Sequence, residues 1–102
     1  MIYVIATMDL KEGCREKYLE IFRKNIPKVR AEKGCLSYEP TVDIDSGLSV
    51  QVDMRDHVVT IVESWESVEA LHDHFKVPHM LTYREAVKDL VNRVSIQVLE
   101  PA

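Results

Sequence analysis

The sequence predicts an α+β fold of the ferredoxin-like type, in which an antiparallel sheet carries its helices on one face. Apolar residues alternate where strands are expected and recur every three or four residues where helices are expected. The resulting order is βαββαβ, with the second helix broken in two. The first strand is apolar on both faces, so we expect something other than the helices to cover the second face of the sheet.

The first half of the chain supplies two strands and a long helix. Met1–Leu10 is expected to be a strand, and 15–30 is expected to be a helix with one apolar stripe formed by Tyr18, Leu19, Phe22, Ile26 and Val29. Gly34 is the expected left-handed residue of the turn that follows. Cys35–Asp43 is the next strand, and Pro40 within it favours an edge position or a bulge.

The second half begins with a segment that is harder to assign. Asp45-Ser46-Gly47 indicates a turn, and the apolar alternation over 48–54 is typical of a short half-buried strand or a hairpin arm. The remaining elements are a strand over 58–66, a helix over 68–76, a helix entered at Pro78 and a strand over 93–100.

Composition narrows the class of protein. With 102 residues we expect one domain over 1–102, large enough for a core of its own. The net charge of −4 and the mixing of acidic with basic residues argue against a nucleic-acid surface. No stretch approaches the roughly 18 apolar residues that span a bilayer, and no signal peptide is evident, so a cytoplasmic protein without membrane contact is expected. Cys14 and Cys35 are interpreted as structural thiols.

Glu63 and Trp65 are the first candidates for a functional site. They lie two residues apart in an apolar strand, so their side chains share one face. An ionised carboxylate among apolar neighbours is costly unless it is paired, and its pKa is a candidate for a shift. The alternative is a Glu63 at the rim of the sheet, either solvated or paired with Arg or Lys, with Trp65 as core packing.

The histidines do not form an evident metal site. His72 and His74 project about 200° apart on a helix, so they cannot both bind one metal ion, and His79 lies beyond a proline. Either of the first two could be a plain surface histidine. Tyr38, Tyr83 and His79 could line the polar end of a pocket, although a tyrosine is more often a packing residue with its hydroxyl at a rim.

Several motifs resemble the antibiotic biosynthesis monooxygenase superfamily, and most of all its bacterial quinol monooxygenase branch. The resemblance covers almost the whole chain and is carried by Gly34-Cys35-x-x-Tyr38, the turn from Asp43 to Gly47, Glu63-Ser64-Trp65-Glu66-Ser67, His74, Pro78-His79-Met80-x-x-Tyr83 and the tail Ile96-x-Val98-Leu99-x-Pro101. It implies a dimeric α+β barrel, a hydrophobic cavity between helices and sheet, and catalysis without flavin, haem or metal.

The resemblance also implies roles for particular residues. His74 would be the catalytic base, because imidazole is the side chain that titrates near neutrality, and Glu63 would orient it or hold a second hydroxyl. Trp65 would form the cavity wall, with Tyr38, His79 and Tyr83 as further substrate contacts. His72 falls outside the pattern.

The expected function is cofactor-independent oxidation of a small aromatic quinol or polycyclic phenol by O₂, in a homodimer or a higher oligomer. The main alternative is a non-catalytic dimer that binds a small ligand or regulates another enzyme. Haem degradation is a weaker alternative: relatives with that activity carry an Asn on the first strand and a ligating His late in the second helical segment, and Thr7 or Met8 and Arg84 stand at those places here.

Overall fold

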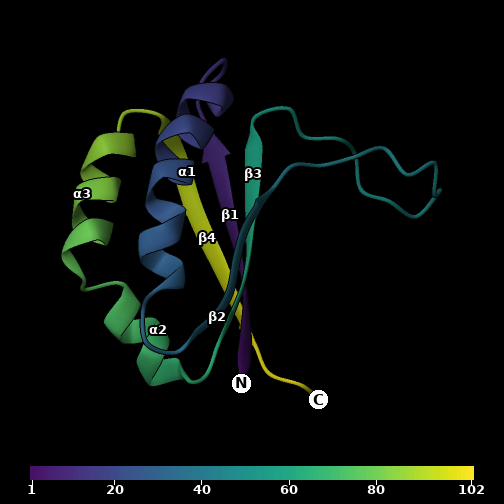
Figure 1. The fold of residues 1–102 in the computed structure, drawn as a ribbon. Helices are drawn as coiled ribbons and strands as arrows, with labels where there is room; N and C mark the ends of the chain where they lie inside the picture. The colour runs from purple at the N-terminus through teal and green to yellow at the C-terminus, as the bar shows by residue number, and fades with distance from the viewer.

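The computed structural model describes residues 1–102 and confirms the predicted order of elements (Figure 1). These are β1 (Ile2–Leu10), α1 (Arg15–Arg30), β2 (Cys35–Thr41), β3 (Val58–Trp65), α2 (Val68–His74), α3 (Pro78–Val87) and β4 (Val91–Leu99). The four strands form one antiparallel sheet in the order β2-β3-β1-β4. The strand β2 lies at the edge of the sheet, where a proline is tolerated, so the edge position expected from Pro40 is confirmed.

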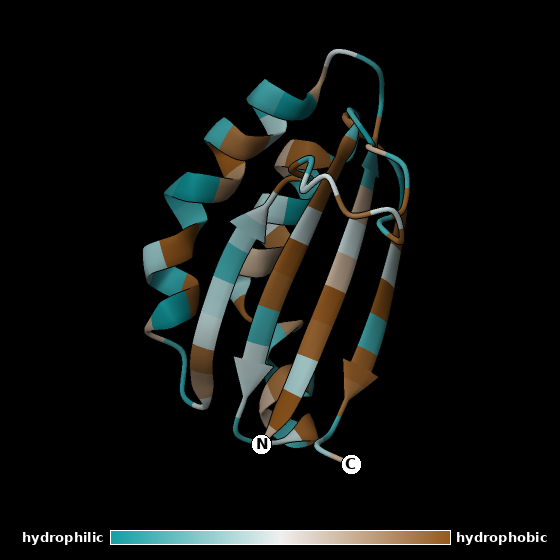
Figure 2. Ribbon diagram, turned by 90° about the vertical axis from the view of Figure 1, so that its right-hand side faces the viewer, coloured by the Kyte–Doolittle hydropathy of each residue, from teal (hydrophilic) through white to brown (hydrophobic).

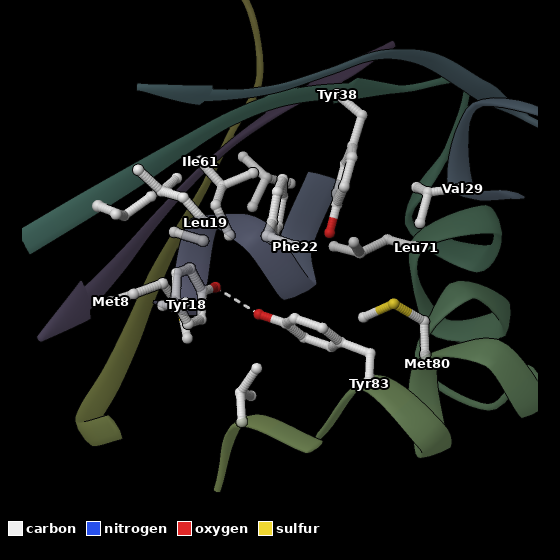
Figure 3. Packing of buried hydrophobic residues seen from close by; sticks show 14 of the residues in the cluster. Met8, Tyr18, Leu19, Phe22, Val29, Tyr38, Ile61, Leu71, Met80 and Tyr83 are labelled. Carbon is white, nitrogen blue, oxygen red and sulfur yellow. Dashed lines mark hydrogen bonds between the residues drawn. The ribbon is translucent and has the colours of Figure 1, made fainter. Parts of the chain in front are cut away.

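All three helices lie on one face of the sheet, and the core fills the space between these two layers (Figure 1). Every second residue of β1, beginning with Ile2, is buried against the helices. The helix α1 contributes the predicted stripe, of which Tyr18, Leu19, Phe22 and Val29 are buried. Figure 3 shows these side chains interdigitating with residues of β3 and α3. No helix is both long enough and apolar enough to cross a bilayer.

The strand β4 extends the sheet beyond the cover of the helices. Its register pairs Val94, Ile96 and Val98 with Met8, Ala6 and Val4, so these side chains share the helix-facing side of the sheet. They are nevertheless exposed, because β4 is the outermost strand. The opposite face also carries exposed apolar side chains, among them Tyr3 and Leu99. Figure 2 views the sheet from that face and shows hydrophobic positions along its strands.

Residues 42–57 form an arm that projects from the face opposite the helices (Figure 1). Asp43 and Arg55 close its base with two hydrogen bonds of 2.9 Å, and the predicted turn is present, with the Gly47 amide donating to Asp45. The predicted half-buried strand over 48–54 is wrong. The alternating apolar residues pair with no other strand, and Val50 is 88% exposed.

The turn between α1 and β2 is packed tightly against α2. Gly34 adopts φ +88, as expected for a left-handed residue, and a Cβ atom placed there would lie only 2.6 Å from the Cβ of Ala70. This close approach brings the neighbouring residue Glu32 to the histidines of α2 and α3. Glycine at 34 is therefore required both by backbone conformation and by space.

We expect Gly34→Ala to lower the free energy of unfolding by about 2 to 4 kcal/mol, the sum of left-handed strain and overpacking. Gly13→Ala is the matched control, because Gly13 also has a positive φ but nothing within 4 Å of the added methyl group. It should cost only about 1 to 2 kcal/mol. Urea denaturation of both variants measures the difference, and equal losses would show that the contact with Ala70 is unimportant.

Candidate active site

One largely apolar cavity of about 350 Å³ lies between the sheet, α2 and α3. Its apolar lining comes from all four strands, from Phe75 at the end of α2 and from α3, and its polar lining includes the side chains of Glu63, His74, Arg84 and Asn92. The full apolar set is Met8, Tyr38, Ile61, Phe75, Met80, Tyr83, Val87, Val91 and Val94. An apolar cavity with few convergent polar groups is typical of a site for a small organic molecule.

His74 is buried in the wall of this cavity. The alternative of a plain surface histidine is therefore wrong for His74, which is only 2% exposed. Its ring packs on Trp65 at a centroid distance of 4.6 Å.

Glu32 fixes the orientation and the tautomer of His74. The Nδ1–H group of His74 donates to both carboxylate oxygens of Glu32 at 3.0 Å. A carboxylate only accepts, so the proton sits on Nδ1 and Nε2 keeps a free lone pair. Burial lowers the pKa of His74, partly opposed by the bond to Glu32, so the imidazole is neutral at pH 7 and able to accept a proton.

His79 lies on the other side of Glu32 and does not line the cavity. Its Nε2–H group donates to Glu32 Oε2 at 2.7 Å, and its ring borders a separate surface groove between α1 and α3. One carboxylate therefore holds two histidines from two different helices. His79 acts here as a support for Glu32, and the expected direct contact between His79 and substrate is not provided by this cavity.

Glu63 is buried beside Trp65, as the shared strand face predicted. The Trp65 Nε1–H group donates to Glu63 Oε1 at 2.8 Å, and Glu63 is 5% exposed. The pKa of Glu63 is raised to about 7, because burial and, to a smaller extent, the charge on Glu32 raise it by more than the bond from Trp65 lowers it. The alternative of a solvated rim carboxylate is therefore wrong. Trp65 itself is fully buried behind Glu63 and His74 and lies outside the cavity lining.

Three tyrosines add hydroxyl groups to the site. The hydroxyls of Tyr18 and Tyr83 are hydrogen-bonded to each other, and the hydroxyl of Tyr38 points toward the same interior region (Figure 3). Burial raises the pKa of Tyr38 and raises that of Tyr83 to about 12, so both remain protonated at neutral pH. The Tyr38 hydroxyl forms no hydrogen bond within the chain, so it is available to a ligand in the cavity.

The structure thus brings four of the six predicted site residues to the cavity: His74, Glu63, Tyr38 and Tyr83. Trp65 supports them from behind, and His79 supports them through Glu32. Glu32 and Arg84 were missed as site residues, because Glu32 lies in a charged turn 42 residues before His74 and no spacing rule links the two. No group of three or more His, Cys, Asp or Glu side chains gathers where it could hold a metal ion.

Comparison with known proteins adds the family. The model of the family described as antibiotic biosynthesis monooxygenase matches residues 1–86. This chain belongs to that family. It is also 40% identical over 103 aligned residues to the protein named "Probable quinol monooxygenase YgiN" of Escherichia coli K12, with 99% of this chain and 98% of that protein covered.

Solved structures of similar proteins agree with this membership. Rv0793 of Mycobacterium tuberculosis is 29% identical with a TM-score of 0.79, and the alignment covers 99% of this chain and 94% of that one. PA3566 of Pseudomonas aeruginosa is 26% identical with a TM-score of 0.80, and the coverage is 99% and 93%. The chain is therefore a monooxygenase of the antibiotic biosynthesis monooxygenase family in fold and in sequence.

The buried Glu63 of this monooxygenase should make its stability depend on pH. Because folding raises the pKa of Glu63 from 4.5 to about 7, the protonated carboxyl is favoured in the fold. The contribution of Glu63 is fully present below pH 4.5 and is lost as the pH rises through 7. Glu63→Gln keeps an acceptor for Trp65 and cannot ionise, so the wild type should lose about 2 to 3 kcal/mol relative to it between pH 4.5 and 8.

Urea denaturation of both proteins at these two pH values measures the change, and taking the difference cancels the other titrating groups. A difference that stays constant across this range would show that Glu63 is ionised in the fold at neutral pH.

Proposed function

We propose that the protein is a cofactor-independent monooxygenase that oxidises an aromatic quinol or a polycyclic phenol with O₂. The observation that carries the proposal is the neutral His74, which lines an apolar cavity and is fixed by Glu32 in the tautomer that leaves Nε2 free. The name of the Escherichia coli relative supports a quinol as the class of substrate.

The proposed oxidation requires only a base and an apolar cavity from the protein. His74 Nε2 accepts the phenolic proton, and the resulting anion donates an electron to O₂ far more readily than the neutral phenol does. Recombination then forms a carbon–oxygen bond and a peroxide. Loss of the ring C–H proton as the O–O bond breaks leaves a carbonyl on the ring and a hydroxide.

The protons balance without an external donor. The two protons removed from the substrate, from its O–H and its C–H, combine with the leaving oxygen as water. All four electrons come from the substrate, so an anthrol plus O₂ gives an anthraquinone plus water. The proton taken by His74 is returned in the last step, and Glu63, with a pKa of about 7, can donate a hydrogen bond to the anion or deliver a proton.

Oxygen uptake by the purified protein with a panel of reduced naphthoquinones and anthrols tests the proposal. His74→Ala should lower kcat by about 10² to 10⁴, the usual contribution of a general base. Glu32→Gln should give a smaller loss and a shifted pH profile, because the amide no longer imposes the Nδ1–H tautomer. The fold should survive both changes, which circular dichroism checks.

His72→Ala is the matched control, because His72 lies on the same helix, is exposed and touches none of these groups. Uptake equal to autoxidation for every substrate would favour the non-catalytic binding module. A His74→Ala protein with the wild-type rate across pH 6 to 8 would remove His74 as the base.

The working form is proposed to be a homodimer. Exposed apolar side chains occur both on the open face of the sheet and along the arm, where Ile44, Leu48 and Val52 are at least two-thirds exposed. A second copy of the chain with its sheet packed on this face would bury both sets. Their exposure in water is unfavourable, at about 25 cal/mol for each Å².

Sedimentation equilibrium across micromolar concentrations should therefore give twice the monomer mass of 11.8 kDa. Val50→Asp together with Leu48→Asp should weaken association, whereas Lys24→Asp on the outside of α1 should not. A single 11.8 kDa species at every concentration would refute the dimer.

A further inference from the structure

The charged side chains that line the cavity are mainly basic, whereas the whole protein is acidic. The chain carries a net charge of −4, yet the ionisable residues that line the cavity include three cations, Arg84, Lys88 and Arg93. Glu63 is the only carboxyl in the lining, and with a pKa of about 7 it is partly neutral at neutral pH. The cavity lining therefore has more basic than acidic side chains, although the whole protein is acidic.

Two of these cations have carboxylate partners and the third has none. Lys88 Nζ lies 2.6 Å from Glu85 Oε1, and Arg93 Nη2 lies 4.0 Å from Asp9 Oδ2. Both are well exposed, so water screens them as well. Arg84 is half-buried and forms no salt bridge in the chain, so its charge is the one that remains uncompensated at the cavity.

The contacts of Arg84 explain its position but leave part of it unsatisfied. Its Nη2–H group donates to the Phe75 carbonyl at 2.7 Å, and its guanidinium lies 5.9 Å from the centre of the Phe75 ring. Phe75 is the C-terminal cap of α2, so this bond satisfies a free carbonyl at the end of that helix. Nη1, however, is buried and has no acceptor, which is costly for a charged donor.

We infer that the substrate is an aromatic acid, a hydroxylated ring that also carries a carboxylate, and that Arg84 pairs with this carboxylate. An anion in the cavity would compensate the free charge of Arg84, which lines the cavity and has no carboxylate partner in the chain. Arginine is suited to this role because its donors match the two oxygens of a carboxylate. A neutral quinol would leave Arg84 unpaired and should bind more weakly. The preference for a carboxylate concerns binding alone. The oxidation of the bound aromatic acid rests on the proposed function.

A matched pair of ligands tests the inference without turnover. Calorimetric titration with 3-hydroxy-2-naphthoate and with 2-naphthol gives the ratio of their dissociation constants, and the two differ only by the carboxylate. We expect the wild type to bind the acid about 10- to 100-fold more tightly, as charge-assisted hydrogen bonds allow. In Arg84→Gln the ratio should fall to about 1, and in Arg84→Lys it should be intermediate.

Lys88→Gln is the control, because it removes a lining charge that already has a partner, and it should keep most of the preference. Equal or weaker binding of the acid by the wild type overturns the inference. So does an Arg84→Gln protein that keeps the wild-type ratio and loses only thermal stability, since Arg84 would then serve only to cap α2.

Oxygen uptake separates this inference from the proposed function. Selective binding of the acid with no uptake of oxygen, for carboxylated or neutral quinols, refutes the oxygenase and leaves the anion site standing. Turnover of neutral quinols by a protein that does not prefer the acid supports the oxygenase and overturns the anion site.

Discussion

The hydrogen bonds that two histidines donate to Glu32 are the constraint on which the rest of the site depends. They join three segments that are distant in sequence: the turn after α1, the end of α2 and the start of α3. Because the side chain of Glu32 is only 9% exposed, its carboxylate has lost most of its hydration and is held by these two imidazole N–H groups instead. The glycine at 34 makes this possible, since only a residue without a side chain lets the turn approach Ala70 so closely.

The two carboxylates of the site, Glu32 and Glu63, lie in different environments. Glu32 accepts hydrogen bonds from two imidazoles, whereas Glu63 accepts one from an indole and faces an apolar cavity. The charge on Glu32 raises the pKa of Glu63, so holding one group ionised helps to keep the other protonated. A base with a lone pair on Nε2 and an acid with a pKa near 7 can then lie in the wall of the same cavity.

Much of the fold was predictable because it depends on local periodicity. The alternation of β1 and the stripe of α1 place their buried residues without reference to the rest of the chain. The shared face of Glu63 and Trp65 follows from the same rule. Glu32 could not be found in this way, because its role exists only when the turn, α2 and α3 are packed together. The prediction of a strand around Val50 is wrong for the opposite reason. These residues alternate as a strand does, but no other strand of the chain pairs with them.

The strand β4 contributes both to the cavity lining and to the exposed apolar surface of the molecule. In β4, Val94 lines the cavity, while Val98 lies on the same helix-facing side of the strand beyond the cavity lining and has no cover within the chain. An apolar strand at the edge of a sheet is a surface that proteins normally cover or pair. A second chain that covered the helix-facing side of β4 would therefore also lie against the part of the cavity that Val94 lines. Exclusion of water there would strengthen every electrostatic interaction inside, including those of His74 and Arg84 with a bound anion.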